Sequence, residues 1–121
     1  MKYILFLAFL VLVASCSNEI QLEPRMAYFL KWDNGFHSID DTLILSASAG
    51  TKDVCRIDRH TSYIKRLDGR SFPREWKNET WVADWNAGKR TLISENKGRI
   101  LVMEDDRKVL VWGNRRYARI K

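Results

Sequence analysis

The stretch that decides the fold is residues 90–120, RTLISENKGRILVMEDDRKVLVWGNRRYARI. It contains four short segments rich in β-branched and aromatic residues, at 90–94, 99–103, 109–112 and 117–120. The residues between these segments are types that favour turns, namely Asn96-Lys97-Gly98, Asp105-Asp106 and Gly113-Asn114. Turns repeated at intervals of about eight to twelve residues predict antiparallel strands joined as hairpins.

The same pattern extends toward the N-terminus. Residues 26–32 end at Asp33-Asn34-Gly35, a strong hairpin signal. Further strands are expected at 36–39, 42–48, 54–57, 62–67 and 80–85, with the longest loop at 70–77. After the first sixteen residues no segment keeps a helical apolar stripe for three turns. We therefore expect an all-β protein, an antiparallel meander of eight or nine short strands that forms a small barrel or sandwich.

The N-terminus is typical of a secretory signal. Lys2 is followed by an apolar run at 4–14 and then by small residues. The run is shorter than the ~20 apolar residues that a membrane-spanning helix needs. We therefore expect the segment to be removed on export.

Val13-Ala14-Ser15-Cys16 resembles the lipobox of bacterial lipoproteins. The resemblance implies a signal peptide at 1–15, a diacylglycerol on Cys16 and an amide-linked acyl chain of the palmitate type. Ser17 resembles the signal for release to the outer membrane, which implies a periplasm-facing protein in a cell with two membranes. The alternative is an ordinary signal peptide cut near Ser15 or Ser17. We divide the chain into this signal, a lipidated cysteine and tether at 16–25, and one β domain at 26–121.

The remaining sequence favours no catalytic centre, cofactor or metal. Lipidation of Cys16 would leave Cys55 alone, and we expect it to be a buried small apolar residue. His37 with Asp40 and Asp41 offers too few nitrogen or sulfur ligands for zinc. Asp58, His60 and Ser62 would share one strand face, but their spacing is too wide for a base to reach a nucleophile. We read them as a solvated face.

Charge gives the clearest indication of a partner. The chain has 21 basic and 15 acidic residues. Residues 107–121 contain no acidic residue and six basic ones, Arg107, Lys108, Arg115, Arg116, Arg119 and Lys121. In a strand, Arg115, Tyr117 and Arg119 would share one face, which predicts a contact for an anionic envelope component or another envelope protein. The alternative is a charged sheet edge that resists pairing. Export removes the protein from nucleic acid.

Five tryptophans are many for so small a domain. Trp81 and Trp85 would share a strand face, either in the core or as a stacking platform for a sugar ring. We expect the core position for both. Trp76, in the predicted loop, is the one expected to be most exposed and is a second candidate for binding.

These observations favour a lipid-anchored, non-catalytic binding protein of the bacterial envelope. Its domain is similar in plan to small lipoproteins that act in assembly, exclusion, immunity or inhibition of hydrolases. Two other functions stay open. One is an envelope hydrolase that uses His60 or His37 with a carboxylate, and the other is a tether between membrane and cell wall.

Overall fold

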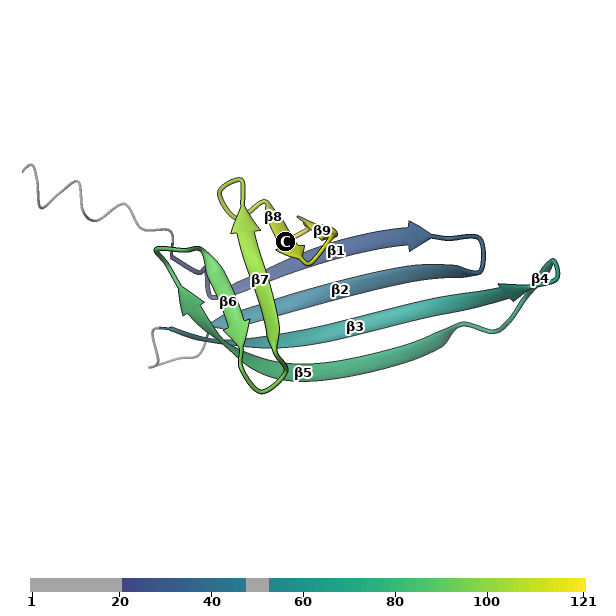
Figure 1. The fold of residues 1–121 in the computed structure, drawn as a ribbon, viewed down its shortest axis with the longest axis horizontal. Helices are drawn as coiled ribbons and strands as arrows, with labels where there is room; N and C mark the ends of the chain where they lie inside the picture. The colour runs from purple at the N-terminus through teal and green to yellow at the C-terminus, as the bar shows by residue number, and fades with distance from the viewer. Residues whose placement is uncertain (1–20, 48–52) are drawn as a thin grey trace, which may run out of the picture.

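A computed structural model describes residues 21–47 and 53–121 of the chain. The described residues form strands and no helix, which confirms the prediction of an all-β fold (Figure 1). The nine strands are β1 (Arg25–Asp33), β2 (His37–Ala47), β3 (Val54–Leu67), β4 (Arg70–Ser71), β5 (Glu75–Asn86), β6 (Thr91–Ser94), β7 (Arg99–Glu104), β8 (Val109–Trp112) and β9 (Arg115–Arg119). The expected signal peptide and Cys16 lie outside the described residues. Within residues 21–47 and 53–121, no helix of membrane-spanning length and apolarity was found.

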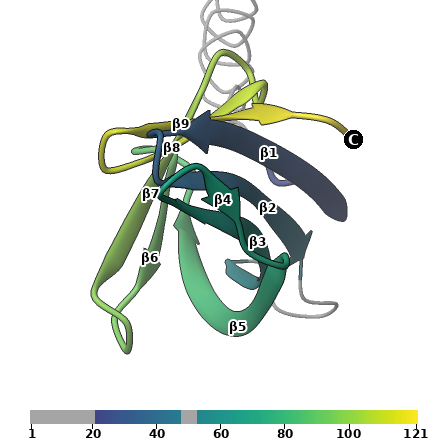
Figure 2. The same ribbon diagram turned by 90° about the vertical axis from the view of Figure 1, so that its right-hand side faces the viewer.

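Eight of the strands close into a barrel. The sheet order is β2-β1-β9-β8-β7-β6-β5-β3-β4, and an additional pairing of β2 with β3 closes the ring. The two-residue β4 adds to the outer part of β3 and lies outside the closed ring. The alternative between barrel and sandwich is therefore settled in favour of the barrel, whose curvature is visible in Figure 2.

The strands of the barrel are of two lengths. β1, β2, β3 and β5 have 9 to 14 residues, whereas β6 to β9 have 4 to 6. β9 pairs with β1 only at Tyr28 and Phe29, and β6 pairs with β5 only at residues 84–86. The four long strands therefore extend beyond the closed part as a curved sheet, seen at the right of Figure 1. The concave side of this extension forms one mouth of the barrel.

Three strand boundaries differ from the sequence prediction. The segments expected at 54–57 and 62–67 form one strand, β3, and those expected at 36–39 and 42–48 are parts of β2. No glycine or proline interrupts either strand. The polar residues between the expected segments keep the strand's alternation of inward and outward side chains, so the chain does not turn there. The loop expected at 70–77 contains β4 and the start of β5, so Trp76 lies in a strand.

The core fills the closed part of the barrel. Its buried members are Met26, Tyr28, Leu43, Leu45, Cys55, Ile57, Trp81, Ala83, Trp85, Leu92, Leu101, Met103, Leu110 and Tyr117. Trp81 and Trp85 therefore belong to the core, as expected. Cys55 is fully buried, as also expected, and burial raises the pKa of its thiol to about 11. A thiol in that setting is poorly suited to act as a nucleophile.

The turn between β1 and β2 shapes one side of the mouth. Gly35 adopts a φ of +86°, a conformation that glycine accepts without strain. The Asn34 side-chain oxygen accepts hydrogen bonds from the backbone N–H groups of Phe36 and His37, at 3.0 and 2.7 Å. This turn confirms the predicted hairpin and sets the register that pairs Trp32 with Ile39.

Candidate functional site at the barrel mouth

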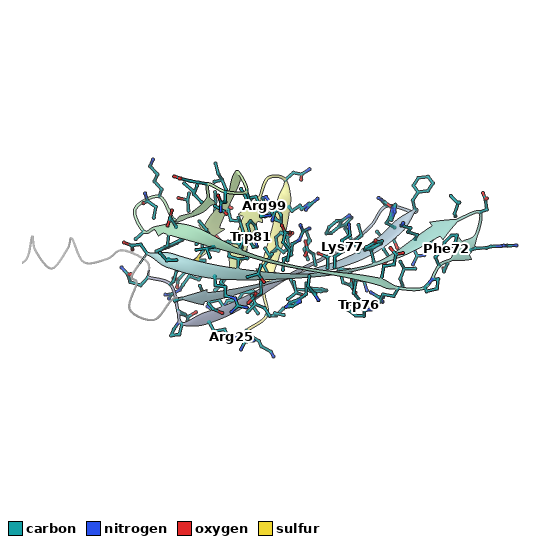
Figure 3. All side chains as sticks on the ribbon, turned by 90° about the horizontal axis from the view of Figure 1, so that it is seen from below. Arg25, Phe72, Trp76, Lys77, Trp81 and Arg99 are labelled. Atoms are coloured by element: carbon teal, nitrogen blue, oxygen red, sulfur yellow. The ribbon has the colours of Figure 1, made fainter. Side chains whose placement is uncertain are left out.

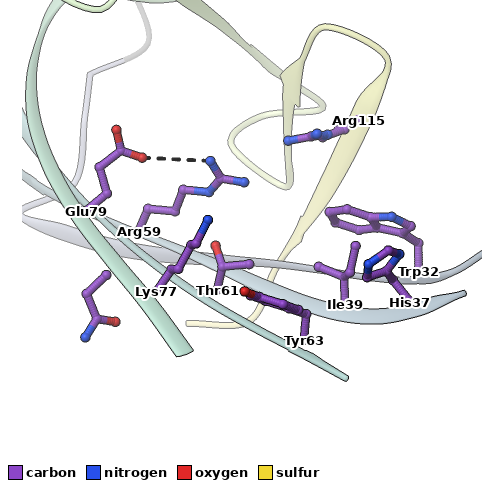
Figure 4. Close-up of a pocket in the computed structure, with 10 residues that line it drawn as sticks. Trp32, His37, Ile39, Arg59, Thr61, Tyr63, Lys77, Glu79 and Arg115 are labelled. Carbon is purple, nitrogen blue, oxygen red and sulfur yellow. Dashed lines mark ion pairs between the residues drawn. The ribbon is translucent and has the colours of Figure 1, made fainter. Parts of the chain in front are cut away.

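A pocket of about 770 Å³ opens at the mouth, on the concave side of the long strands (Figure 4). Its lining combines aromatic, basic and small polar side chains, namely Trp32, His37, Ile39, Arg59, Thr61, Tyr63, Lys77, Asn78, Glu79 and Arg115. Strand alternation explains most of this set, because inward positions recur at every second residue. The volume lies in the range of pockets that hold small ligands.

Asp41 lies behind the pocket lining, where it contacts the lining residues Arg59 and Thr61. The side chain is fully buried and forms an ion pair with Arg59, whose Nη2 lies 2.9 Å from Oδ2. Arg59 Nε also donates to both carboxylate oxygens, at 3.1 and 3.2 Å. The hydroxyls of Thr61 and Tyr117 donate at 3.0 and 2.7 Å. A buried carboxylate needs such partners, so this cluster is a rigid base that fixes Arg59.

Tyr117 belongs to this buried cluster. Burial and then its hydrogen bond to Asp41 raise the pKa of the Tyr117 hydroxyl far above its ordinary value. The hydroxyl therefore stays protonated and serves as a donor. It does not supply a base.

Three arginines and three tryptophans stack alternately near the pocket, in a set that we call the Arg/Trp ladder. Its members are Trp81, Arg99, Trp112, Arg59, Arg115 and Trp32. The guanidinium of Arg99 lies 4.3 Å from the Trp81 ring centroid and 5.1 Å from that of Trp112. Arg59 lies 4.7 Å from the Trp112 centroid. The Trp81 and Trp112 rings are 5.3 Å apart and tilted by 45°. Each of these distances is within the range of a cation–π contact or an aromatic pair, so the ladder holds its cations in fixed positions.

The ladder continues to the rim of the mouth through Arg115. Its guanidinium lies 5.2 Å from the ring centroid of Trp32 and 5.5 Å from that of Trp112. Trp32 comes from the end of β1 and Arg115 from the start of β9, so the contact joins two sides of the mouth.

The cations of the pocket differ in whether a carboxylate pairs with them. Glu79 lies 2.8 Å from Arg99 and 3.8 Å from Arg59, the second contact being drawn in Figure 4. Within residues 21–47 and 53–121, neither Arg115 nor Lys77 has a carboxylate within 4.0 Å. Lys77 lies 6.0 Å from the Tyr63 ring centroid. The pocket therefore has two positive charges available to a negatively charged ligand.

The residues predicted for binding occupy different environments. Arg115, Tyr117 and Arg119 do share one face of β9, but that face is directed into the barrel. Arg115 lines the pocket, whereas Tyr117 is fully buried, so its expected role as a surface contact is wrong. Arg119 forms an ion pair with Glu23, and its Nε donates to the Lys121 carbonyl at 2.8 Å.

Trp76 is 70% exposed, the highest value among the exposed large apolar side chains of the described residues. Its ring lies 5.8 Å from the guanidinium of Arg74. Figure 3 shows Trp76 and Lys77 on opposite faces of β5. Trp76 is therefore exposed as predicted but does not line the mouth pocket, and no contact in the described residues links it to Arg115.

The expected patch of uncompensated charge on the C-terminal hairpin is smaller than predicted, because three of its six basic residues have carboxylate partners. Arg116 pairs with Glu104 at 3.2 Å and Arg107 pairs with Asp106 at 3.5 Å, in addition to the pair between Arg119 and Glu23. The carboxylates come from outside residues 107–121, and folding brings them to the hairpin. In the described residues Lys108, Arg115 and Lys121 have no carboxylate within 4.0 Å, and of these three only Arg115 lines the mouth pocket.

Asp58, His60 and Ser62 lie on the outer face of β3 and contact separate partners. Asp58 accepts from Thr80 at 2.8 Å, His60 lies 2.8 Å from the Asn78 oxygen, and Ser62 accepts from Arg74 at 2.7 Å. The three do not form an acid–base–nucleophile set. Ser62 is only 5% exposed because Arg74 covers it, so the solvated face that we expected is wrong at this position.

The suggested metal ligands near the first turn are also separated. Asp41 faces the interior, while Asp40 lies on the other face of β2 and pairs with Arg74 at 3.4 Å. His37 lines the mouth. In the part of the chain that the structure describes, no group of three or more histidine, cysteine, aspartate or glutamate side chains is placed to hold a metal.

Sequence reasoning missed most of the pocket. Trp32, Arg59 and Lys77 were not singled out, and Arg115 was assigned to an outer surface. A continuous β3 would have placed Arg59 and Thr61 on the inward face with Ile57. The comparisons with known proteins add no further assignment, because no family model, no curated protein and no solved structure matches the chain.

Proposed function

We propose that the chain is a non-catalytic binding protein, held to the bacterial envelope by a lipid on Cys16, whose barrel mouth receives an anionic part of its partner. The observation that carries the proposal is the pair of cations, Arg115 and Lys77, that line a ligand-sized pocket without a carboxylate partner in the described residues. Cations held against rings in a partly enclosed pocket are well suited to bind carboxylate or phosphate.

The direction of the mouth is consistent with a tethered receptor. β1 starts at Arg25, and the mouth lies at its far end, beside Trp32 and the turn to β2. Seven residues of extended strand separate Arg25 from Trp32, which is about 23 Å at ~3.3 Å per residue. With an anchor at Cys16, the pocket would point away from the membrane. This direction fits a partner within the periplasm or on the cell wall, and the outer-membrane location that we propose rests on Ser17 alone.

Trp76 is a second contact that we propose for a large partner. Its exposed ring lies on the outer face of β5, the strand that also supplies Lys77 to the pocket. Exposed tryptophans beside basic residues are frequent at binding surfaces. A partner that spans the rim of β5 would touch both residues.

The test is cross-linking and pull-down of the full chain from membranes of a two-membrane bacterium. We compare the wild type with Lys77→Gln/Arg115→Gln and with a control, Lys89→Gln/Arg116→Gln, which removes the same charge from exposed positions outside the pocket. The pocket variant is expected to lose most captured partner at low salt, while the control retains it. Equal capture by all three forms would refute the mouth as the binding centre.

The same experiment separates a protein partner from a tether function. A tether predicts that isolated cell-wall polymer alone retains the wild-type chain and fails to retain the pocket variant. A protein partner predicts a defined cross-linked band that polymer does not displace.

A further inference from the structure

The mouth pocket contains two kinds of contact surface next to each other. Trp32, Ile39 and Tyr63 provide apolar surface, while Arg115 and Lys77 provide the available positive charge. The Arg115 guanidinium lies 5.2 Å from the centroid of the Trp32 ring, so a positive charge and an aromatic ring lie next to each other at the rim. A ligand that contacts both must carry an acidic group attached to an apolar face.

A third set of side chains narrows the ligand class. Thr61 of β3 and His37 of β2 also line the pocket. The Thr61 hydroxyl, which donates to Asp41, can still accept a hydrogen bond, and the His37 ring can donate or accept one. A flat aromatic acid would leave these groups without partners, at a cost in binding free energy. The ring of a sugar has an apolar C–H face and hydroxyls around its edge, so it can use both surfaces.

We infer that the mouth binds a sugar ring that bears an oxyanion, either a carboxylate or a phosphate. This inference rests on the proposed function and names the ligand class for the same pocket. The oxyanion lies between Arg115 and Lys77, the C–H face packs on Trp32 or Tyr63, and the hydroxyls face Thr61 and His37. An inorganic anion would not use the rings, and a neutral sugar would leave two cations unpaired.

The pocket size is consistent with one or two sugar units. About 770 Å³ exceeds the needs of an inorganic anion and falls within the range for small ligands. The unit could be a free acidic sugar or part of an anionic polysaccharide, because the same recognition chemistry applies to both.

The experiment measures binding to the full chain, purified in mild detergent, by calorimetry and by tryptophan fluorescence. The probes are glucuronate, glucose 6-phosphate, glucose, acetate and inorganic phosphate. At least one acidic sugar is expected to bind tenfold or more tightly than glucose and than its matching small anion. Tenfold corresponds to about 1.4 kcal/mol. Two further probes are galacturonate and its tetramer: tighter binding of the tetramer indicates a polymer source, and equal affinity indicates a free sugar.

The variants assign the contacts. Lys77→Gln and Arg115→Gln are each expected to reduce the affinity for the acidic sugar to near that of glucose. Trp32→Leu is expected to weaken all the sugars and to leave acetate unchanged. Arg116→Gln is the matched control, because Arg116 is the next residue of β9 but faces outward and pairs with Glu104. Circular dichroism checks folding, and Lys77→Gln, at an exposed position, serves if Arg115→Gln does not fold.

Two results would overturn the inference. The first is that both acidic sugars bind no better than glucose or than the small anions. The second is that their binding is unaffected by Lys77→Gln and Arg115→Gln. Both differ from failure of the proposed function, in which these variants leave partner capture from membranes unchanged. Capture that depends on the pocket, without acidic-sugar binding, keeps the proposed function and rejects the ligand class.

Discussion

Asp41 is the residue on which the mouth depends. Its carboxylate is fully buried and has three partners, Arg59, Thr61 and Tyr117. Removing one member of a buried ion pair leaves the other charge without compensation, which costs more than the pair contributes in net stability. The orientation of Arg59 over Trp112 depends on the same carboxylate.

We expect Asp41→Asn to lower the free energy of unfolding by about 3–5 kcal/mol, because Arg59 would lose its buried counter-charge. Urea denaturation followed by tryptophan fluorescence measures the change. The control is Asp40→Asn, which removes a partly exposed ion pair with Arg74 and should cost less than about 1 kcal/mol. Similar losses in the two variants would contradict the anchoring role of Asp41.

The role of Asp41 could not be predicted from the sequence. Its partners Arg59, Thr61 and Tyr117 are 18, 20 and 76 residues away along the chain. Asp40 and Asp41 are adjacent and of the same type, so the sequence does not distinguish them. Which of the two faces inward depends on which alternate positions of β2 point into the barrel, and the structure shows that Asp41 does. The exposure of Trp76 and the burial of Cys55 were predictable, because each follows from local composition.

At the scale of the element, β3 is the strand that organises the sheet. It pairs with β2 over residues 55–65 and with β5 over residues 54–63, so most of its backbone is hydrogen-bonded on both sides. By contrast, β5 at residues 75–83 pairs with β3 alone among the described strands. These two environments should differ in protection from solvent.

We expect the amides of residues 58–62 to exchange with deuterium slowly, at rates set by global unfolding, because both neighbouring strands cover them. Alternate amides of β5 at residues 75–78 should exchange much faster, since their free edge faces solvent. Exchange followed by nuclear magnetic resonance tests both. Fast exchange throughout residues 58–62 would instead support the two separate strands predicted from the sequence.

The alternation and the turn residues were sufficient to predict an all-β fold. They did not give strand ends, because charged residues such as Asp58 and Arg59 continue a strand as readily as they end one. The charge count of residues 107–121 missed the carboxylate partners of three of its six basic residues. Arg116 and Arg119 are paired by Glu104 and Glu23, and a count within residues 107–121 has no access to those partners.

At the scale of the whole molecule, the proposed anchor precedes the start of β1 in the sequence, and the mouth lies at the other end of β1. Nine residues, 17–25, follow Cys16 up to and including Arg25, and they reach at most about 30 Å when extended. The pocket would therefore stay within a few tens of ångströms of the membrane that carries the lipid.

We expect Cys16→Ser to abolish lipid attachment, because the thioether needs the cysteine sulfur. The chain should then remain as an unprocessed precursor or leave the membrane fraction. Cell fractionation with metabolic labelling by a fatty acid measures the outcome. The control is Cys55→Ser, which should keep the label, and a labelled, membrane-bound Cys16→Ser protein would contradict the lipoprotein assignment.

The free edge of β5 has a consequence for solubility. In the part of the chain that the structure describes, the backbone of residues 75–83 has no neighbouring strand on the side away from β3, and such an edge can template aggregation. Glu75, Lys77 and Glu79 place a charge at every second position over residues 75–79 of this edge. Two strands that stacked in register would bring like charges together, so these residues keep separate barrels apart. Lys77 would thus serve both recognition and colloidal stability, and its removal would carry a risk of filament-like association at high protein concentration.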